Sequence, residues 1–374
     1  DTSRTQAQDL SINGHIDLKQ GAMNTAEIML AAPNWPLDRE TLLALPQELS
    51  DCLLHLAPTG SVLLDPAEIR LVKRPDGAVQ FSYDMTLHSR DCRFKAVGTE
   101  GRYTGSIQVI GQYHSKEGLE KASIAMNAQS LTIKEKTAEN MHALISYDPI
   151  QRTWQSNDIL ADFYGGRLLG RLEHQRRADG TTRVGLQLGL SHSDFGQFMA
   201  RPSADLLETE QAPRGVLNAE LSLMLSPGDK AARRGRCLIT ITDMRVGRTP
   251  LLSQLLSTLQ LSEPSDHQFD SLLVDGYIKG DQLVIDKFDM SGESAAFWGR
   301  GHLNLLNENI DLQLSARGKR RAYAEPSVIQ SLTEGVVGAV MRVNITGTLS
   351  SPRVVPQALP MIEDSLRRLT PPAH

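Results

Sequence analysis

The side chains that most often do chemistry in proteins are scattered along this sequence. Its 10 histidines form no HExxH motif and no pair at metal-binding spacing, so the sequence predicts no metal site. HSDFG, at His192 to Gly196, contains the kinase letters DFG, but no Gly-rich loop, strand lysine or catalytic loop accompanies it. GxSxG and GxxxxGK[ST] do not occur. We therefore expect no enzymatic activity and no cofactor.

The three cysteines, Cys52, Cys92 and Cys237, lie far apart in the sequence. They form no CxxC pair, and an odd number defines no disulfide framework. The simplest interpretation is three separate buried thiols, which do not identify a cellular compartment.

The composition excludes two classes of protein. A net charge of −5 and a pI near 6.1 argue against a general nucleic-acid binder, which is usually basic. No apolar run reaches the roughly 18 residues that a membrane-spanning helix needs, and the chain does not open with a signal-peptide pattern. We interpret the 374 residues as a processed or excised piece of a longer protein, with any membrane anchor upstream.

Basic residues gather in three short runs, which are HQRRADGTTR (174–183), KAARRGR (230–236) and RGKRRA (317–322). We expect all three between strands, at turns. They are either solvated loops on a rim or contacts for anionic lipid headgroups.

The secondary structure is predicted from the alternation of apolar and polar residues along the chain. In Phe297 to Gly318, Leu303 and Leu305 point one way from an extended chain, and Leu306 to Asn309 turns it. Ile310, Leu312 and Leu314 then share a face, separated by polar residues. The pattern predicts a hairpin with one apolar and one polar face.

Most of the chain repeats this pattern, with Gly, Asn-Gly or Asp-Gly turns between the segments, and it predicts roughly eighteen antiparallel strands. Helical signals are few. Leu37 to Leu56, SDFGQFMA (193–200), a segment starting at Thr249-Pro250, Pro326 to Val340 and the tail from Gln357 are the expected helices.

A long antiparallel sheet with one apolar face has three ways to cover it. The sheet can close as a barrel, pack on a second sheet as a sandwich, or curl into an open trough whose inner face stays apolar. Aromatic residues make up only 5% of the chain, which is low for a tight sandwich core.

The segment from Asn157 to Pro356 resembles the C-terminal region of the AsmA-like family, relatives of the TamB and YhdP envelope proteins of diderm bacteria. Four segments carry the resemblance, and their order is more specific than any one of them. They are ILADFYGGRLLGRLE, RVGRTPLLSQLLSTLQL, the hairpin run FDSLLVDGYIKGDQLVIDKFDMSGESAAFWGRGHLNLLNENIDLQLSARG, and VMRVNITGTLSSPRVVPQ.

The resemblance implies a mostly β fold, an elongated antiparallel sheet curled into an open trough with a few short α-helices. It implies a non-enzymatic, periplasmic protein that moves or holds phospholipid or another acyl lipid between the inner and outer membranes, or supports outer-membrane assembly. The implied tether is an inner-membrane anchor upstream, and envelope proteins at the trough ends are the implied partners.

The resulting division of the chain has five parts. Residues 1–60 hold N-terminal strands and a helix that continue an upstream part, and residues 61–200 form a β-trough segment. Residues 201–213 are a linker-like loop, 214–356 an AsmA-like β module, and 357–374 an amphipathic helix or tail.

Alternating apolar residues are the candidates for the groove lining. Moving two sixteen-carbon acyl chains into water costs on the order of 20 kcal/mol, and a continuous apolar groove removes most of that cost. The candidates are Leu186, Leu188, Leu190, Leu217, Leu221, Leu223, Leu303, Leu305, Ile310, Leu312, Leu314, Val343 and Ile345. Small residues such as Gly170 and Ala219 either leave room for acyl chains or relieve crowding.

Two other functions remain open at this point. The first alternative to a lipid carrier is a structural or scaffolding envelope protein, whose dry core is closed and whose surface binds protein partners. The second is a hydrolase or sugar-binding β domain. A hydrolase needs convergent polar groups, and a sugar binder needs aromatic platforms, whereas the 3 tryptophans are dispersed.

Overall fold

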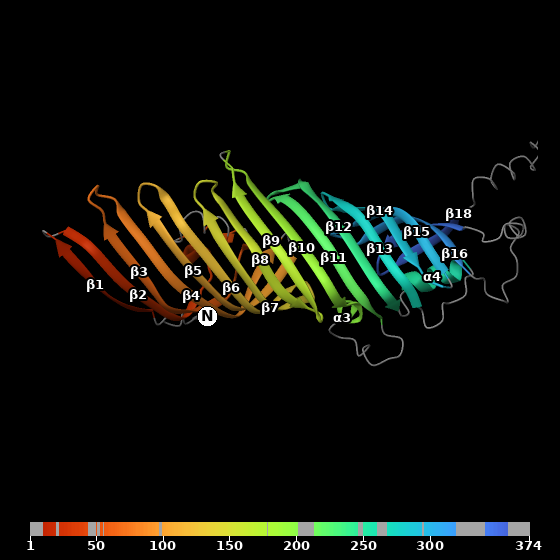
Figure 1. The fold of residues 1–374 in the computed structure, drawn as a ribbon, viewed down its shortest axis with the longest axis horizontal. Coiled ribbons are helices and arrows are strands. Elements are labelled where there is room, and N and C mark those ends of the chain that lie inside the picture. Colours follow the sequence, from red (N-terminus) through yellow and green to blue (C-terminus); the bar gives the residue numbers. More distant parts are fainter. Residues whose placement is uncertain are drawn as a thin grey trace, which may run out of the picture. The chain divides into compact units, whose positions relative to one another are not determined.

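The computed structural model describes residues 10–19, 22–43, 50, 53–54, 56–96, 99–177, 179–200, 213–245, 250–259, 268–293, 295–318 and 341–357. Within these ranges the chain forms one 18-stranded antiparallel sheet, which strand pairing does not close on itself, and a few short helices (Figure 1). This confirms the mostly β class and the expected number of strands. The expected helix at 326–340, most of the linker and nearly all of the tail lie outside the described residues.

The chain divides into two compact units. Unit 1 comprises residues 1–163, 167–188 and 226–228, and unit 2 comprises 164–166, 189–225 and 229–374. Each unit is described by itself below.

Unit 1 is built from long strands, each paired with the next through β8. A short helix, α1 (Arg39–Leu43), follows the second strand. The strands are β1 (Ser11–Lys19), β2 (Ala22–Pro36), β3 (Ser61–Lys73), β4 (Val79–Ala96), β5 (Thr99–His114), β6 (Gly118–Ile133), β7 (Lys136–Asp148), β8 (Thr153–Phe163), β9 (Gly166–Arg176) and the first part of β10 (Thr182–Asp194).

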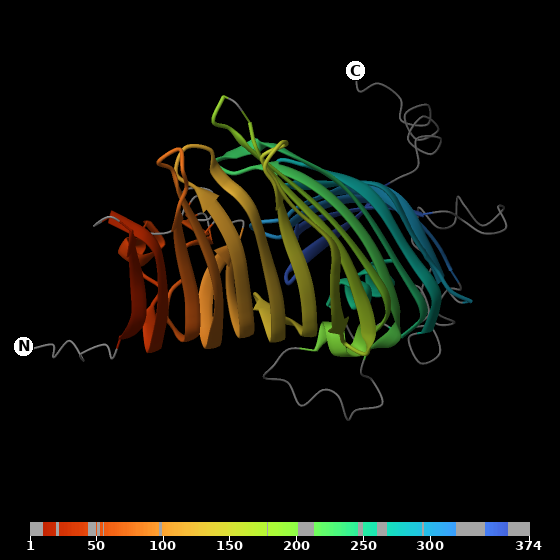
Figure 2. The same ribbon diagram turned by 60° about the vertical axis from the view of Figure 1, so that its left-hand side comes forward.

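Register shifts interrupt these strands partway along their length. They fall between Leu64 and Glu68 on β3, between Ser89 and Cys92 on β4, and between Thr104 and Gly105 on β5. Such bulges bend a strand and increase its twist. The long strands of unit 1 accordingly curve along their length rather than running flat (Figure 2).

Unit 2 continues the same up-and-down order, with each strand from β12 to β18 paired to the next. Its elements are α3 (Phe195–Met199), β11 (Arg214–Ser226), β12 (Asp229–Arg245), α4 (Pro250–Thr258), β13 (Gln268–Lys279), β14 (Gln282–Ser291), β15 (Ala295–Asn304), β16 (Asn309–Gly318), β17 (Met341–Thr348) and β18 (Pro352–Gln357).

Both described helices of unit 2 begin as their sequences predict. Asp194 is the N-cap of α3, where its carboxylate oxygen Oδ1 accepts a hydrogen bond of 3.0 Å from the backbone N–H of Gln197. The kinase-like letters at His192 to Gly196 are therefore a strand end and a helix cap. Pro250 occupies the first position of α4, where its fixed φ suits a helix and no N–H is needed.

A single core of large side chains covers the apolar face of unit 2. Phe297 and Ile345 are fully buried, and Val343 is 1% exposed. Leu255 and Leu256 of α4 belong to the same cluster, so this helix packs on the apolar face of the sheet. Phe269 and Phe297 lie side by side in this core, with 6.3 Å between their ring centroids.

One basic run does not lie where we expected it. Lys230 to Arg236 are inside β12, because the turn is made earlier by Pro227-Gly228, with Gly228 at φ 88°. Within the strand, Arg233 Nη1 donates to Asp281 Oδ1 at 2.9 Å and Arg236 Nη2 pairs with Asp275 Oδ2 at 3.0 Å. Arg233 and Arg236 therefore form ion pairs with carboxylates of unit 2. The expectation that the whole run is a turn was wrong.

Replacing Phe297 with Ala tests whether this side chain is buried in the core of unit 2. A fully buried Phe→Ala change leaves a cavity, so we expect a loss of about 3–5 kcal/mol in the free energy of unfolding, measured by urea denaturation with circular dichroism. The control is Trp298→Ala on the same strand, whose side chain is 38% exposed. Equal losses in both variants would contradict the burial difference.

Candidate functional site

The apolar side chains of unit 1 line up in rows across its strands. Residues directly opposite one another in antiparallel strands share a face. One row runs Ile16, Ala26, Leu71, Phe81, Tyr113, and another runs Met85, Val109, Ile124, Ile145.

We call this side of the sheet the unit 1 apolar face. It comprises Ile12, Ile16, Leu18, Ala26, Ile28, Leu30, Ile69, Leu71, Phe81, Tyr83, Met85, Leu87, Ile107, Val109, Tyr113, Ile124, Met126 and Ile145. Polar residues alternate with these, as where His15 faces Glu27 across β1 and β2.

The unit 1 apolar face is incompletely covered. Ile12, Ile16 and Leu18 are 61%, 62% and 63% exposed, and every residue of β1 is exposed. Phe81 and Met85, farther along the face, are half-buried. Exposed apolar patches are common where a protein binds another protein, a membrane or a ligand, so this face is the candidate functional site.

Small side chains make up much of what is buried in unit 1. Ala128, Ala138, Ala143 and Ala161 belong to one buried cluster, and Ala32 and Ala67 belong to another. The cluster of unit 2, in contrast, consists mainly of Leu, Ile and Phe. These alanines are themselves buried, and larger, partly buried side chains such as Phe94, Met126 and Leu87 pack against them.

The candidate lining residues of unit 2 divide by depth. Six are buried, with exposed fractions from 0% to 6%: Leu217, Ile310, Leu312, Leu314, Val343 and Ile345. Leu190, Leu221, Leu223, Leu303 and Leu305 are half-buried and pack against the same core. The structure therefore brings these eleven residues together in the hydrophobic core of unit 2.

The other two candidates, Leu186 and Leu188, lie on the part of β10 that belongs to unit 1, and both are half-buried. A Cβ added at Gly170 would approach the Cδ2 atom of Leu188 at 2.9 Å and Cβ of Ile159 at 3.1 Å. Gly170 therefore relieves crowding between two apolar side chains.

We did not name the residues of β1 to β6 as a lining from the sequence. Their alternation is as regular as that of the named residues, with Phe81, Tyr83 and Met85 on one side of β4. The signal that the sequence offers for β1 is the apolar spacing of Ile12, Ile16 and Leu18. Alternation alone does not distinguish a covered face from an uncovered one.

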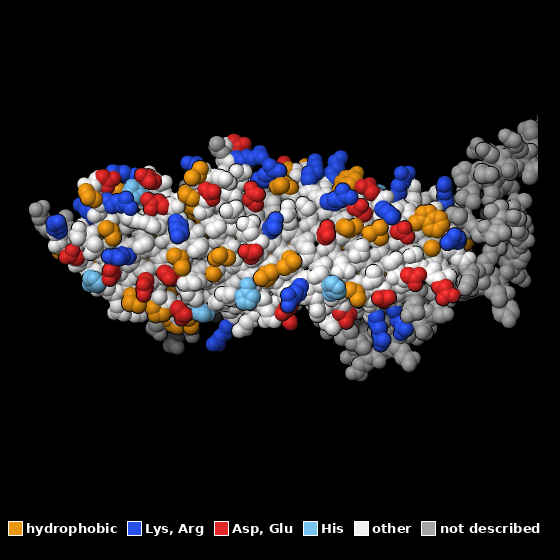
Figure 3. Space-filling model, viewed as in Figure 1, with side chains coloured by type: hydrophobic (Ala, Val, Ile, Leu, Met, Phe, Trp, Pro, Cys, Tyr) orange, Lys and Arg blue, Asp and Glu red, His pale blue; other side chains and the backbone are white. Residues whose placement is uncertain are grey.

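A hollow of ≈ 350 Å³ lies on the opposite, polar side of β3 to β6. Its lining includes the charged residues Glu68, Arg70, Asp84 and Lys121. Burying such groups against hydrocarbon is unfavourable, so the hollow is unsuited to acyl chains. Figure 3 shows apolar side chains interspersed with charged ones over the face in view.

The two described thiols are poor nucleophiles. Burial raises the pKa of Cys92 and of Cys237, which keeps both protonated at neutral pH, and both are free cysteines. Burial also raises the pKa of the nearby Tyr103 to about 12, and its hydroxyl donates to the Ser106 carbonyl oxygen at 2.7 Å. Cys52 lies outside the described residues.

No family model, curated protein or solved structure matches the chain. The AsmA-like resemblance thus remains a hypothesis, as does everything it implies. Among the residues that the structure describes, no helix is long and apolar enough to span a membrane.

Aspartate substitutions distinguish covered from uncovered apolar positions. Leu312→Asp would bury an unpaired charge in the core of unit 2, and we expect it to lower the free energy of unfolding by about 3 kcal/mol or more. Ile16→Asp on β1 should change it by less than about 1 kcal/mol, because the side chain already contacts water. Urea denaturation measures both, and a large loss for Ile16→Asp would mean that the unit 1 apolar face is covered in solution.

Proposed function

We propose that the protein is a non-enzymatic lipid carrier that holds the acyl chains of phospholipid, or of another acyl lipid, on the unit 1 apolar face. The observation that carries the proposal is the row of exposed apolar side chains on β1, continuous by register with half-buried ones on β3 to β6. Unit 2, whose apolar face is buried, serves as the stable support in this proposal.

The energetics favour an acyl ligand. Each CH2 group removed from water contributes about 0.8 kcal/mol, so ten of them contribute about 8 kcal/mol. The face runs over seven strands, β1 to β7, which at about 4.8 Å apart span about 29 Å, longer than the roughly 15 Å of hydrocarbon in one bilayer leaflet. The face is therefore wide enough for a whole acyl chain lying across the strands.

This function requires that the sheet form an open trough. Support comes from the bulges on β3, β4 and β5, which curve the strands. The periplasmic location, the inner-membrane tether upstream, the envelope partners and the part in outer-membrane assembly come from the AsmA-like resemblance alone.

A scaffolding role is the second candidate, and the core of unit 2 favours it. Most of the lining candidates named from the sequence belong to this core, in which Ile345 and Phe297 are fully buried. A scaffold would act through its polar surface and would carry no lipid on either unit.

Substitutions on the two sides of β1 test the carrier proposal. The triple variant Ile12→Asp, Ile16→Asp, Leu18→Asp places three charges on the unit 1 apolar face at positions that are already exposed. We expect at least a tenfold weaker affinity for a fluorescent acyl-labelled phospholipid, since losing about 1.4 kcal/mol of contact suffices. The readout is a fluorescence titration of the intact chain.

The matched control is Ser11→Asp, Asn13→Asp, His15→Asp, which adds the same charges to the polar side of the same strand. It should bind the labelled lipid as the unchanged protein does. Equal affinity in all three proteins would exclude the β1 face as the binding surface. Absence of binding to the unchanged protein would favour the scaffold.

A further inference from the structure

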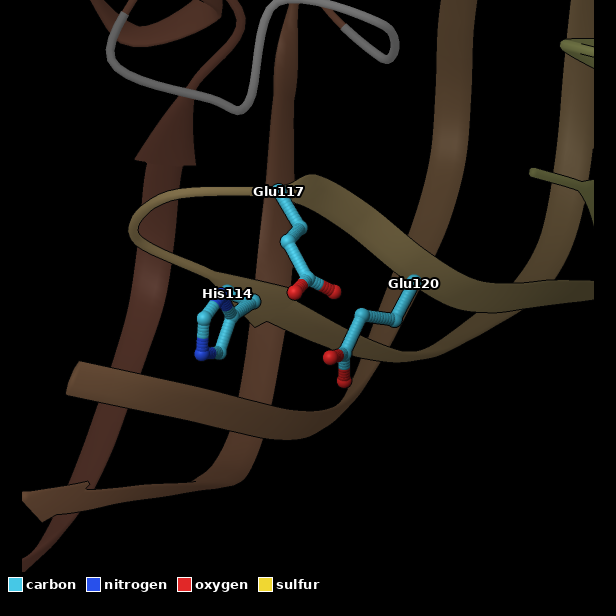
Figure 4. Close-up of side chains that lie close together, drawn as sticks. All are labelled: His114, Glu117 and Glu120. Carbon is cyan, nitrogen blue, oxygen red and sulfur yellow. The ribbon is translucent and has the colours of Figure 1, made fainter. Parts of the chain in front are cut away.

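The hairpin between β5 and β6 places three potential metal ligands together. β5 ends at His114, the turn contains Glu117, and β6 begins at Gly118 with φ 86°, a conformation that glycine adopts readily. A ring nitrogen of His114 and one carboxylate oxygen each of Glu117 and Glu120 lie within 4.8 Å of one another. Figure 4 shows the three side chains side by side at the end of the hairpin.

A β-bulge accounts for the position of Glu120. Gln112 pairs with Lys121, but Tyr113 pairs with Leu119, which leaves Glu120 as the extra residue. An extra residue in one strand re-aims its side chain. Without the bulge, strict alternation would separate Glu120 from the carboxylate of Glu117.

His114 supplies an independent indication of a ligand. Its side chain is buried, with only 4% of the residue exposed, and Nδ1 has no hydrogen-bond partner. A buried polar atom without a partner is unfavourable, and an ion that satisfies the ring is one of the ordinary explanations. The ring lies beside the two carboxylates (Figure 4).

The neighbouring charges leave the two carboxylates available. Lys116 lies in the same turn, but its ammonium group donates to Asp76 Oδ2 at 3.1 Å and also to the Asp76 carbonyl oxygen. Glu117 is exposed and Glu120 half-buried, so both side chains can adjust their rotamers. Two carboxylates this close repel each other, and a cation between them removes that repulsion.

We propose that His114, Glu117 and Glu120 bind a divalent transition-metal ion, with Zn²⁺ as the best match. An imidazole together with carboxylates suits zinc, whereas calcium and magnesium prefer oxygen ligands alone. Zinc bonds of about 2.0–2.2 Å require the three ligand atoms to move closer than they now lie, which the exposed Glu117 can do by rotation. Three protein ligands leave a fourth position for water.

This site is independent of the unit 1 apolar face. It joins the turn to both strands of the hairpin, so bound metal stabilises unit 1. Binding to the folded form alone should raise the melting temperature by about 5 °C at a hundredfold excess of zinc over the dissociation constant.

Titration of the intact, tag-free chain with zinc chloride tests the proposal. We expect one zinc ion per chain by isothermal titration calorimetry and elemental analysis, with at least tenfold weaker binding in Glu117→Gln, Glu120→Gln. The control Glu135→Gln, Glu139→Gln removes the same charge from the next hairpin, at two exposed residues, and should bind zinc normally. Magnesium and calcium should not compete.

Two outcomes would overturn the site. One is absence of stoichiometric zinc in the unchanged protein, and the other is undiminished binding in Glu117→Gln, Glu120→Gln. If the double variant does not fold, as judged by circular dichroism, X-ray absorption of the zinc complex decides. Coordination of zinc by one imidazole nitrogen and carboxylate oxygens would support the site. Coordination by two or more imidazoles would show that the ion binds elsewhere.

Discussion

The alternation of apolar and polar side chains along antiparallel strands determines the other features of this structure. It gives the sheet one apolar face, and that face must be covered by the protein or by something else. In unit 2 the protein covers it, because large side chains of the sheet and Leu255 and Leu256 of α4 fill one core. In unit 1 the cover is incomplete, because Ile12, Ile16 and Leu18 on β1 are exposed. The same sequence pattern therefore leads to two different surfaces.

Much of the fold was predictable from local chemistry. The hairpin around Asn307, the shared face of Ile310, Leu312 and Leu314, and the helix beginning at Pro250 all follow from spacing and turn residues. The burial of Leu312 and the exposure of Ile16 did not follow from spacing, because apolar and polar residues alternate equally regularly around both. What separates them is the tertiary cover, which depends on residues far away in the sequence.

The same limit applies to the polar features. Lys230 to Arg236 look like a loop by composition, yet Pro227-Gly228 has already made the turn. Two of the arginines pair with carboxylates, one on β13 and one in the turn between β13 and β14. From the sequence we expected no metal site, because no recognised spacing of histidines occurs. The grouping of His114, Glu117 and Glu120 arises from a register shift, which a sequence motif does not encode.

The central claim is that acyl chains occupy the unit 1 apolar face and not the core of unit 2. Photo-crosslinking tests it most directly, with a phospholipid that carries a diazirine on its acyl chain and peptide mass spectrometry to locate the adducts. We expect adducts on β1 and on the half-buried positions of β3 to β6, such as Phe81 and Met85. Adducts confined to unit 2, or none at all after incubation with lipid vesicles, would contradict it.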